Sequence, residues 1–369
     1  MKTRFTALFA LFALMLNASA FAAAAGSGVA KETSFVTPVP ASPLVQMLPT
    51  SDVVASVDVR RVFDDMLPRV LSSKQPVLAK VMSSIDEIQS KTGIDVRKFG
   101  QLAVGLKFKN LSVSNPDFDF VAITRGEINA GALVGLVKVG TNGKYREVKV
   151  GDKTMYVFKV EDTPVAKKTS TSGKQAAGRS TANAGKRPAA KPASAAKAPP
   201  SLQEIAVSIL DANTLAIGST AQVRETLAAT TSVSADLVSL LSTESAAIVT
   251  FAGQMPAGTA KLLPLENDEI GKAISSIRYV AGSVDMNDSG ALLRILARTL
   301  QAEQAQSLLD MVQGLQMVGK AFLSSSKRPD QQVFARMLEN ARFTRQGNDV
   351  SLELSVAQSD IDVLVAGIK

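Results

Sequence analysis

The sequence predicts an α+β protein in which helices pack on antiparallel sheet, arranged as two related lobes. Apolar residues recur at the helical spacing i, i+3, i+4 in some segments and alternate with polar residues in others. Neighbouring strand segments are joined by short turns such as Gly151-Asp152-Lys153, which favours hairpins and therefore antiparallel pairing. The chain is 46% hydrophobic over 369 residues, which is enough to bury a core in each of two domains.

The N-terminus has the pattern of a secretory signal peptide. Lys2 and Arg4 precede an apolar run over 5–16, and the small residues Ala18 and Ala20 follow it. We predict a signal peptide over 1–25. Because 26–48 is rich in Ala, Gly, Ser and Pro, we expect an extended spacer there, before the fold. The protein is then exported, periplasmic or secreted, with no transmembrane span after cleavage.

The first lobe is predicted over 49–243. Ser219 and Gln222 have the spacing of a capping box, which predicts the start of a helix after the strand expected at 214–218. The earlier helices are expected at 59–71, 77–88 and 129–139, and the strands at 51–59, 101–108, 119–126, 145–150, 154–160, 204–211 and 214–218.

The second lobe is predicted over 244–369 and repeats the element order of the first. The segment 241–251 echoes 48–58, and each is followed by helical segments, two strands, a helix and a hairpin. This order predicts a tandem duplication, although few residues are identical between the lobes. The expected strands are 276–286, 291–299, 341–345 and 350–356; one helix carries Ala305, Leu308, Val312, Leu315 and Phe322, and a final helix begins at a Ser359 cap.

Positive charge is concentrated in one tract. Between 163 and 200 there are eight Lys or Arg residues and no Asp or Glu, which matches the net charge of +8 for the whole chain. The Lys, Ala and Pro composition predicts a disordered insertion over 161–201. We interpret it as a flexible connector; weak contact with anionic envelope polymers is the second hypothesis, and a nucleic-acid arm, the third, is not expected in an exported protein. The candidate polyanion contacts are Lys167, Lys168, Lys174, Arg179, Lys186, Arg187, Lys191 and Lys197.

The composition excludes several kinds of chemistry. The chain has no cysteine and no histidine, so it has no disulfide, no thiol nucleophile and no histidine-dependent triad. It also lacks the commonest transition-metal ligand. We therefore expect no catalytic residue, no metal site and no cofactor.

Five segments carry a resemblance to other sequences: 52–70, 92–108, 121–134, 144–160 and 206–227. They are similar to a family of uncharacterised exported bacterial proteins. The resemblance implies a signal peptide and α+β lobes, and it implies no activity, ligand or catalytic residue. In that family the strands near Val160 and Glu204 are joined without so long a basic tract, which implies that the tract is an insertion.

One short motif resembles that of penicillin-interacting serine enzymes. Ser324 and Lys327 have the S-x-x-K spacing, and Lys91-Thr92-Gly93 supplies a K-T-G. In those enzymes the K-T-G follows the serine motif on a strand, whereas here it precedes the serine and stands at the end of a helix. No S-D-N is present, so we interpret the match as coincidence.

Acidic clusters give two further candidates. Asp285 to Gly290 has calcium-loop spacing, but the twelfth position, which should be a bidentate carboxylate, is Leu296. We therefore interpret it as a tight turn between strands. The carboxylates at 64–65 and 266–269 are interpreted as helix-terminus charges or solvated faces.

These observations favour a non-enzymatic envelope protein that acts by binding or scaffolding, with an unidentified envelope partner. The alternative is a histidine-independent hydrolase that uses Ser/Lys or carboxylate chemistry. A Ser-Lys pair or convergent carboxylates in a deep pocket would favour the hydrolase, and filled lobes with shallow surfaces would favour the scaffold.

Overall fold

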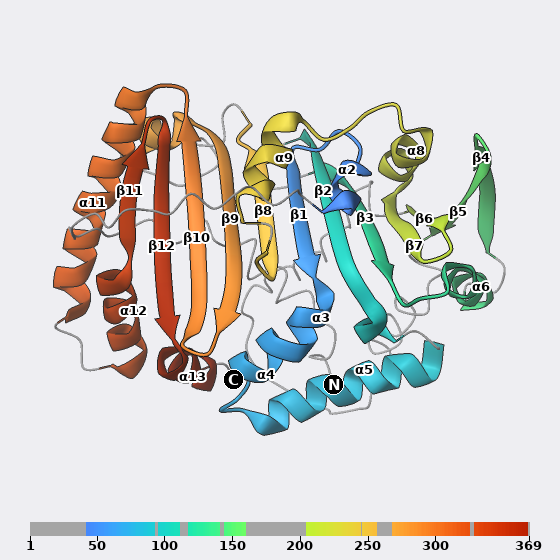
Figure 1. Ribbon diagram of the computed structural model, residues 1–369, viewed down its shortest axis with the longest axis horizontal. Helices are drawn as coiled ribbons and strands as arrows, with labels where there is room; N and C mark the ends of the chain where they lie inside the picture. The colour runs from blue at the N-terminus through green and yellow to red at the C-terminus, as the bar shows by residue number, and fades with distance from the viewer. Residues whose placement is uncertain are drawn as a thin grey trace, which may run out of the picture. The chain divides into compact units, whose positions relative to one another are not determined.

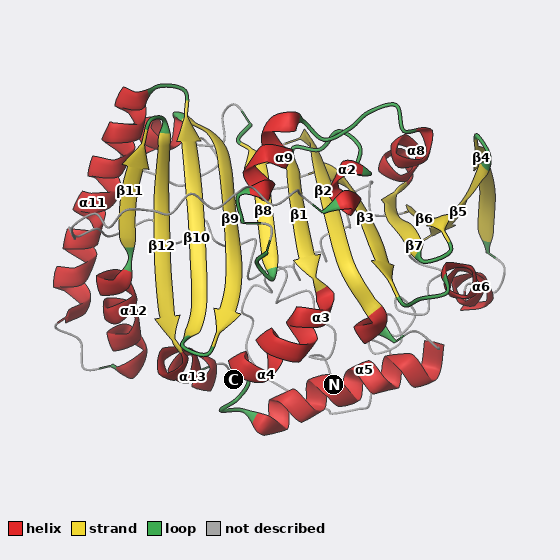
Figure 2. Cartoon of the chain, viewed as in Figure 1, coloured by secondary structure: helices red, strands yellow, loops and turns green. Residues whose placement is uncertain are grey.

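Helices and antiparallel strands make up the computed structural model, which describes residues 42–92, 95–110, 117–140, 144–159, 204–244, 246–256, 268–324 and 328–367 (Figures 1 and 2). This confirms the α+β class and the antiparallel sheet. The expected signal peptide, most of the spacer and the basic insertion lie outside the described residues. In the described ranges, no helix is both long enough and apolar enough to span a membrane.

Contacts divide the described residues into two compact units. The N-terminal unit contains 42–63 and 79–244, and the C-terminal unit contains 64–78 and 246–367. Each unit contains an antiparallel sheet and helices that pack on it.

The N-terminal unit has its strands in the spatial order β1-β2-β3-β7-β6-β5-β4. Neighbouring strands are antiparallel, and the alignment places Val54 opposite Gly105 and Gly105 opposite Val121. Lys159 lies opposite Glu204, so 160–203 connects two adjacent strands. The strands are β1 (Val53–Asp58), β2 (Phe99–Asn110), β3 (Asp117–Gly126), β4 (Tyr145–Val150), β5 (Lys153–Lys159), β6 (Glu204–Asp211) and β7 (Thr214–Ser219).

The helices of this unit follow the apolar stripes found in the sequence. The expected stripe at 59–71 forms an α-helical turn, a π-helical segment and a second α-helical turn. The elements are α2 (Pro43–Gln46), α3 (Val59–Arg61), η2 (Val62–Met66), α4 (Leu67–Val70), α5 (Gln75–Thr92), η3 (Val96–Lys98), α6 (Ala130–Gly140), α8 (Thr220–Ala228) and α9 (Ala235–Ser242); α4, most of η2 and the start of α5 belong to the C-terminal unit.

Helix α2 differs from the expectation of an extended spacer up to residue 48. Leu44, Val45 and Leu48 are fully buried, and α2 contacts β1, β2 and β3. Pro43 indicated extended backbone in the sequence, but it occupies the first turn of the helix, where a missing N–H removes no hydrogen bond. The folded part therefore begins earlier than predicted.

The C-terminal unit has its strands in the order β11-β12-β10-β9-β8. Ala305 and Leu308 of α11 pack on Val350 of β12, with Ala297 and Ile277 beside them. The elements are β8 (Val249–Gln254), α10 (Asp268–Ser275), β9 (Ile277–Asn287), β10 (Gly290–Thr299), α11 (Ala302–Ser324), α12 (Pro329–Asn340), β11 (Arg342–Gln346), β12 (Asp349–Ala357) and α13 (Gln358–Ala366).

Two helix caps expected from the sequence were wrong. Ser219 occupies the N-cap position of α8, which confirms the predicted start of this helix, but its hydroxyl exchanges hydrogen bonds with the backbone of Phe120 on β3, at 3.2 Å each, and makes no capping bond. Gln222 is buried, and its amide has no hydrogen-bond partner among the described residues. Ser359 lies inside α13, whose N-cap position is Ala357. In the first case a neighbouring strand competes for the hydroxyl, which local sequence cannot indicate.

The strand order is the same in both units except for one hairpin. Starting at β1, neighbouring strands of the N-terminal unit follow the order β1-β2-β3-β7-β6. Starting at β8, those of the C-terminal unit follow the order β8-β9-β10-β12-β11. In both, a helical segment follows the first strand, another follows the third, and a helix follows the hairpin that completes the series. The hairpin β4-β5 is the additional element of the N-terminal unit.

Candidate binding face and the polar network opposite it

The sheet formed by β1, β2 and β3 carries apolar side chains on both of its faces. Helices cover one of these two faces. On the covered face Val54, Ala103, Val121 and Ile123 are fully buried. An atom built at the Cβ position of Gly105 would lie 3.6 Å from Leu48, which places the segment after α2 on this face. In Figure 1, α2 and α9 are drawn in front of these strands.

The opposite face of the same strands carries a continuous apolar surface, which we call the apolar strip. The register places Leu106 between Val53 and Phe120, and Val104 between Ala55 and Ala122. Apart from Val104, every member is only partly buried. The strip consists of Val53, Ala55, Val57, Leu102, Val104, Leu106, Phe108, Phe118, Phe120 and Ala122, with no charged side chain among them.

Helix α6 borders the strip on the same face. Its Ala130 and Val134 pack with Leu215, Val207 and Phe158 on β7, β6 and β5. Ile217 of this cluster lies directly opposite Ala122, so the α6 cluster adjoins the strip on the same face. The part of the face on β5 to β7 is thus covered by α6, whereas the part on β1 to β3 stays partly open.

The C-terminal unit has a corresponding surface. Val249, Val284 and Leu293 lie side by side on β8, β9 and β10, and α11 packs at the Val350 end of the same face. The residues that remain partly exposed there are Val249, Phe251, Val280, Val284, Leu293, Ile295 and Leu352. Each unit therefore presents apolar sheet that its described helices do not fully bury.

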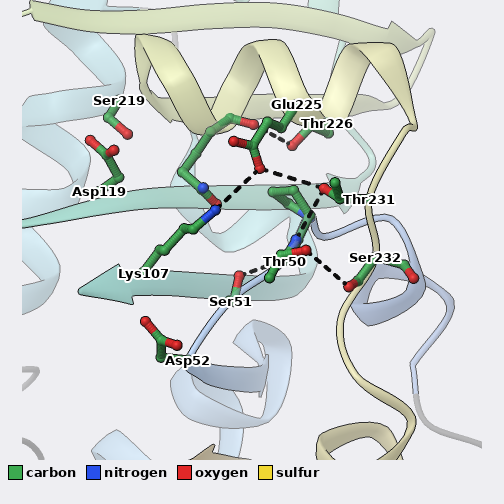
Figure 3. A network of polar contacts seen from close by, with 12 residues as sticks. Thr50, Ser51, Asp52, Lys107, Asp119, Ser219, Glu225, Thr226, Thr231 and Ser232 are labelled. Carbon is green, nitrogen blue, oxygen red and sulfur yellow. Dashed lines mark hydrogen bonds and ion pairs between the residues drawn. The ribbon is translucent and has the colours of Figure 1, made fainter. Parts of the chain in front are cut away.

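A polar network lies on the covered face of the N-terminal unit (Figure 3). Lys107 Nζ is 3.8 Å from Glu225 Oε2 of α8, and the Thr231 hydroxyl donates to the same oxygen at 3.5 Å. Thr50 donates from its backbone N to Thr231 Oγ1 at 3.3 Å and from its hydroxyl to the carbonyl of Ser232 at 3.5 Å. The network therefore joins the segment before β1, strand β2, helix α8 and the loop after it.

The hydroxyls around this network are bonded to backbone. Ser51 donates to the carbonyl of Pro49 at 2.9 Å, Thr226 to that of Gln222 at 2.9 Å, and Ser219 to that of Phe120 at 3.2 Å. A nucleophilic hydroxyl needs an adjacent base to take its proton, and none of these three donates to a side-chain base. The arrangement holds segments together and does not form a nucleophile-base pair.

The serine motif does not come together as a site in the described residues. Ser324 is the last residue of α11 and donates to the carbonyl of Ala321 at 3.3 Å, and Lys327 lies outside the described residues. Lys91 and Thr92 end α5, and Gly93 is not described.

The calcium-like segment is the turn between β9 and β10, as predicted. Asp288 and Ser289 form the turn, and Gly290 has a φ of +137° that favours glycine. The guanidinium of Arg69 bonds Asp288 Oδ1 at 3.0 Å and the carbonyl of Asn287 at 3.2 Å. The side-chain oxygens at the first and third positions of the proposed calcium loop, Asp285 Oδ1 and Asn287 Oδ1, accept hydrogen bonds from the backbone N of Met286 and of Ser289, at 2.9 Å each.

The other acidic candidates are placed on helices. Asp64 and Asp65 lie in the π-helical segment η2, and Asp268 and Glu269 open α10, while 266–267 lie outside the described residues. In the described part of the chain, no three acidic side chains form a group that could hold a metal ion. The eight candidate polyanion contacts, Lys167 to Lys197, all lie outside the described residues.

The fold and these surfaces define an α+β protein with antiparallel sheet and helices on it. The structure is similar to three crystal forms of TP0453, a Treponema pallidum protein. Crystal forms I, III and IV have TM-scores of 0.40, 0.41 and 0.41 and identities of 10%, 10% and 9%. The matches cover 90% of this chain and 98% or 99% of TP0453. No protein-family model and no curated protein matches the chain, so the resemblance to a family of exported proteins stays a prediction.

Proposed function

We propose that this chain is an exported, non-enzymatic envelope protein that acts by binding, and that the apolar strip is its binding surface. The observation that carries the proposal is the asymmetry of β1 to β3. Both faces are apolar, yet Val54 and Ala103 on one face are fully buried while Val53 and Leu102 on the other are partly exposed. Contiguous exposed apolar surface marks interaction sites on soluble proteins.

Two further observations support a binding role over a catalytic one. The hydroxyls Ser51, Ser219 and Thr226 donate to backbone carbonyls, so they have no side-chain base to accept their protons. Some charged side chains pair across adjacent strands, as Arg298 of β10 does with Asp349 of β12 at 2.7 Å. A carboxylate held by an arginine in this way stays ionised and is a poor general acid at neutral pH.

The tandem duplication predicted from the sequence belongs to this proposal. The shared strand order supports it, because five strands occupy corresponding places in the two units. Apolar surface recurs on corresponding strands as well, with Val53 on β1 and Val249 on β8. The duplicated unit would then be a sheet with one helix-covered face and one binding face.

The basic tract keeps its role as a connector in this proposal. Lys159 and Glu204 lie opposite each other on adjacent strands, which supports an insertion into a hairpin. Any contact with anionic envelope polymers is expected to reside in Lys167 to Lys197 alone, because the eight basic residues of the tract equal the net charge of +8 and leave the rest of the chain without net positive charge.

Site-specific photocrosslinking in the envelope tests the proposal. A photoreactive residue replaces Leu106 in the strip, and a matched variant carries it at Arg224, which is exposed on α8. We expect a discrete adduct from position 106 and only background from position 224. Equal background at both positions in folded, exported protein would overturn the proposal.

A further inference from the structure

We propose that the apolar strip of the N-terminal unit binds a single acyl chain of a monomeric long-chain fatty acid. This rests on the proposed function and names the chemical class of the ligand. Three properties of the strip carry it: the absence of hydrogen-bonding groups on it, a border toward α6 whose Thr124 hydroxyl is already hydrogen-bonded, and its position beside that helix.

The strip offers no hydrogen bonds to a ligand. Strand β2 is paired with β1 and β3, and β3 with β2 and β7, so the backbone groups of these two strands are used within the sheet. The hydroxyl of Thr124 at its border donates to the carbonyl of Gln101 at 3.1 Å. An extended peptide on this surface would bury its own N–H and C=O groups without partners, which is unfavourable. An acyl chain has no such groups to satisfy.

The border of the strip also favours an acyl chain over a protein helix as the ligand. Protein interfaces surround an apolar centre with a polar rim that forms hydrogen bonds. Toward β7, Ala122 of the strip lies directly opposite Ile217, which packs with α6. Thr124 lies between Leu102 and Leu215, but its hydroxyl already donates to the carbonyl of Gln101. A helix docked here would bring its polar residues against apolar side chains on that side.

The position of α6 favours a monomer over a membrane surface. Helix α6 packs on the same face of the sheet as the strip, through Ala130 and Val134. A layer packed on a sheet stands about 10 Å above it. A flat bilayer would meet α6 before it reached Leu106, whereas a single chain could lie along β2 beside the helix.

The size of the strip fits one chain. From Leu102 to Phe108 on β2, at a rise of roughly 3.4 Å per residue, the strip is about 20 Å long, and its three strands make it about 10 Å wide. Each methylene buried on binding should tighten binding about fourfold, the equivalent of about 0.8 kcal/mol. Affinity should therefore rise with chain length until the chain spans the strip.

The test measures binding of saturated fatty acids of increasing length, below their micelle concentrations, to the mature full-length protein by calorimetry. A photoreactive fatty acid followed by peptide mapping then locates the chain. We expect about fourfold tighter binding per added methylene and adducts on β1 to β3. Ala122→Trp and Ala55→Trp, which fill the strip, should weaken binding at least tenfold in variants whose circular dichroism is unchanged. The matched control is Ala221→Trp, on the exposed surface of α8, and it should bind like the unmodified protein.

Several results would overturn the inference. They are absence of fatty-acid binding by folded protein, adducts mapped outside β1 to β3, or binding to phospholipid vesicles with none to monomers. The length series needs no variant, so misfolding of a Trp variant does not remove the test. If fatty acids fail to bind while the photoreactive residue at position 106 still forms its envelope adduct, this inference fails and the proposed function stands. If both fail, the function fails as well.

Discussion

At the scale of single residues, Asp52 fixes the start of the β1-β2 pairing. Its carboxylate accepts from the backbone N of Phe108 at 2.8 Å, and its own N donates to the carbonyl of Leu106 at 2.7 Å. Asp52→Ala removes the acceptor of Phe108 N, so we expect a loss of about 1–2 kcal/mol in the free energy of unfolding. Asp52→Asn keeps an acceptor oxygen and should lose less. Urea denaturation of both variants checks the order, and equal losses would contradict it.

Asp95 gives the protein a pH-dependent contribution to stability. The hydrogen bond from Arg97, 2.8 Å from Nε to Oδ1, holds the pKa of Asp95 below its ordinary value, although partial burial opposes the shift. Because the folded-state pKa is lowered, the contribution is present above the unfolded pKa near 4 and is lost as pH falls through the folded value. We expect Asp95→Asn to be less stable than the unmodified protein at pH 7. The difference in the free energy of unfolding between the two proteins should shrink toward pH 2. A difference that does not change with pH would contradict this explanation.

At the scale of elements, two glycines with opposite surroundings provide a matched test. A Cβ on Gly218 of β7 would lie 2.2 Å from the carbonyl oxygen of Phe120, whereas nothing lies within 4 Å of a Cβ on Gly135 in α6. Gly218→Ala should destabilise by about 3 kcal/mol, because backbone must move. Gly135→Ala should stabilise by about 0.5–1 kcal/mol through helix propensity. Thermal melts of the two variants measure both effects, and similar melting temperatures would contradict the close pairing of β3 with β7 at Gly218.

Most elements could be predicted from the sequence because their apolar spacing is regular. The strand expected at 101–108 is the centre of β2, and the helix expected at 129–139 is α6 within one residue at each end. Helix α2 was missed because its Pro-rich surroundings concealed one buried turn, Leu44, Val45 and Leu48. The Ser219 cap was wrong because the partner of that hydroxyl, Phe120, is distant in sequence.

The candidate binding face could not be predicted from the sequence, although the sequence contains a signal for it. The segment QLAVGLKF is apolar at successive positions, which indicates a strand covered on both sides. The face that becomes covered is the one on which α2 and α8 pack. The spacing of apolar residues along the chain does not determine on which side these helices pack. Figure 3 shows α8 on the side of Lys107, so the partly open face is the side of Leu106.

At the scale of the whole molecule, replacing 160–203 with an Asn-Gly turn tests the insertion. Lys159 and Glu204 are already opposite each other, so the hairpin can close without other changes. A shorter loop lowers the entropic cost of closing the hairpin, so we expect the free energy of unfolding to rise by about 2 kcal/mol. We also expect the variant to lose heparin binding in a salt series. An unfolded variant would show that the tract is needed for the fold, and retained heparin binding would place the anion site elsewhere.

The accessibility of the strip to a thiol reagent distinguishes an open binding face from a covered one. Because the sequence contains no cysteine, only the introduced thiol reacts. Single cysteines replace Leu106 in the strip, Ala103 on the covered face and Ala221 on α8, and the rate of thiol alkylation is measured in the purified protein. We expect Leu106→Cys to react at a rate between those of buried Ala103→Cys and exposed Ala221→Cys, and we expect long-chain fatty acid to slow its reaction about tenfold. A Leu106→Cys thiol as unreactive as that of Ala103→Cys would show that the strip is covered and would contradict the account.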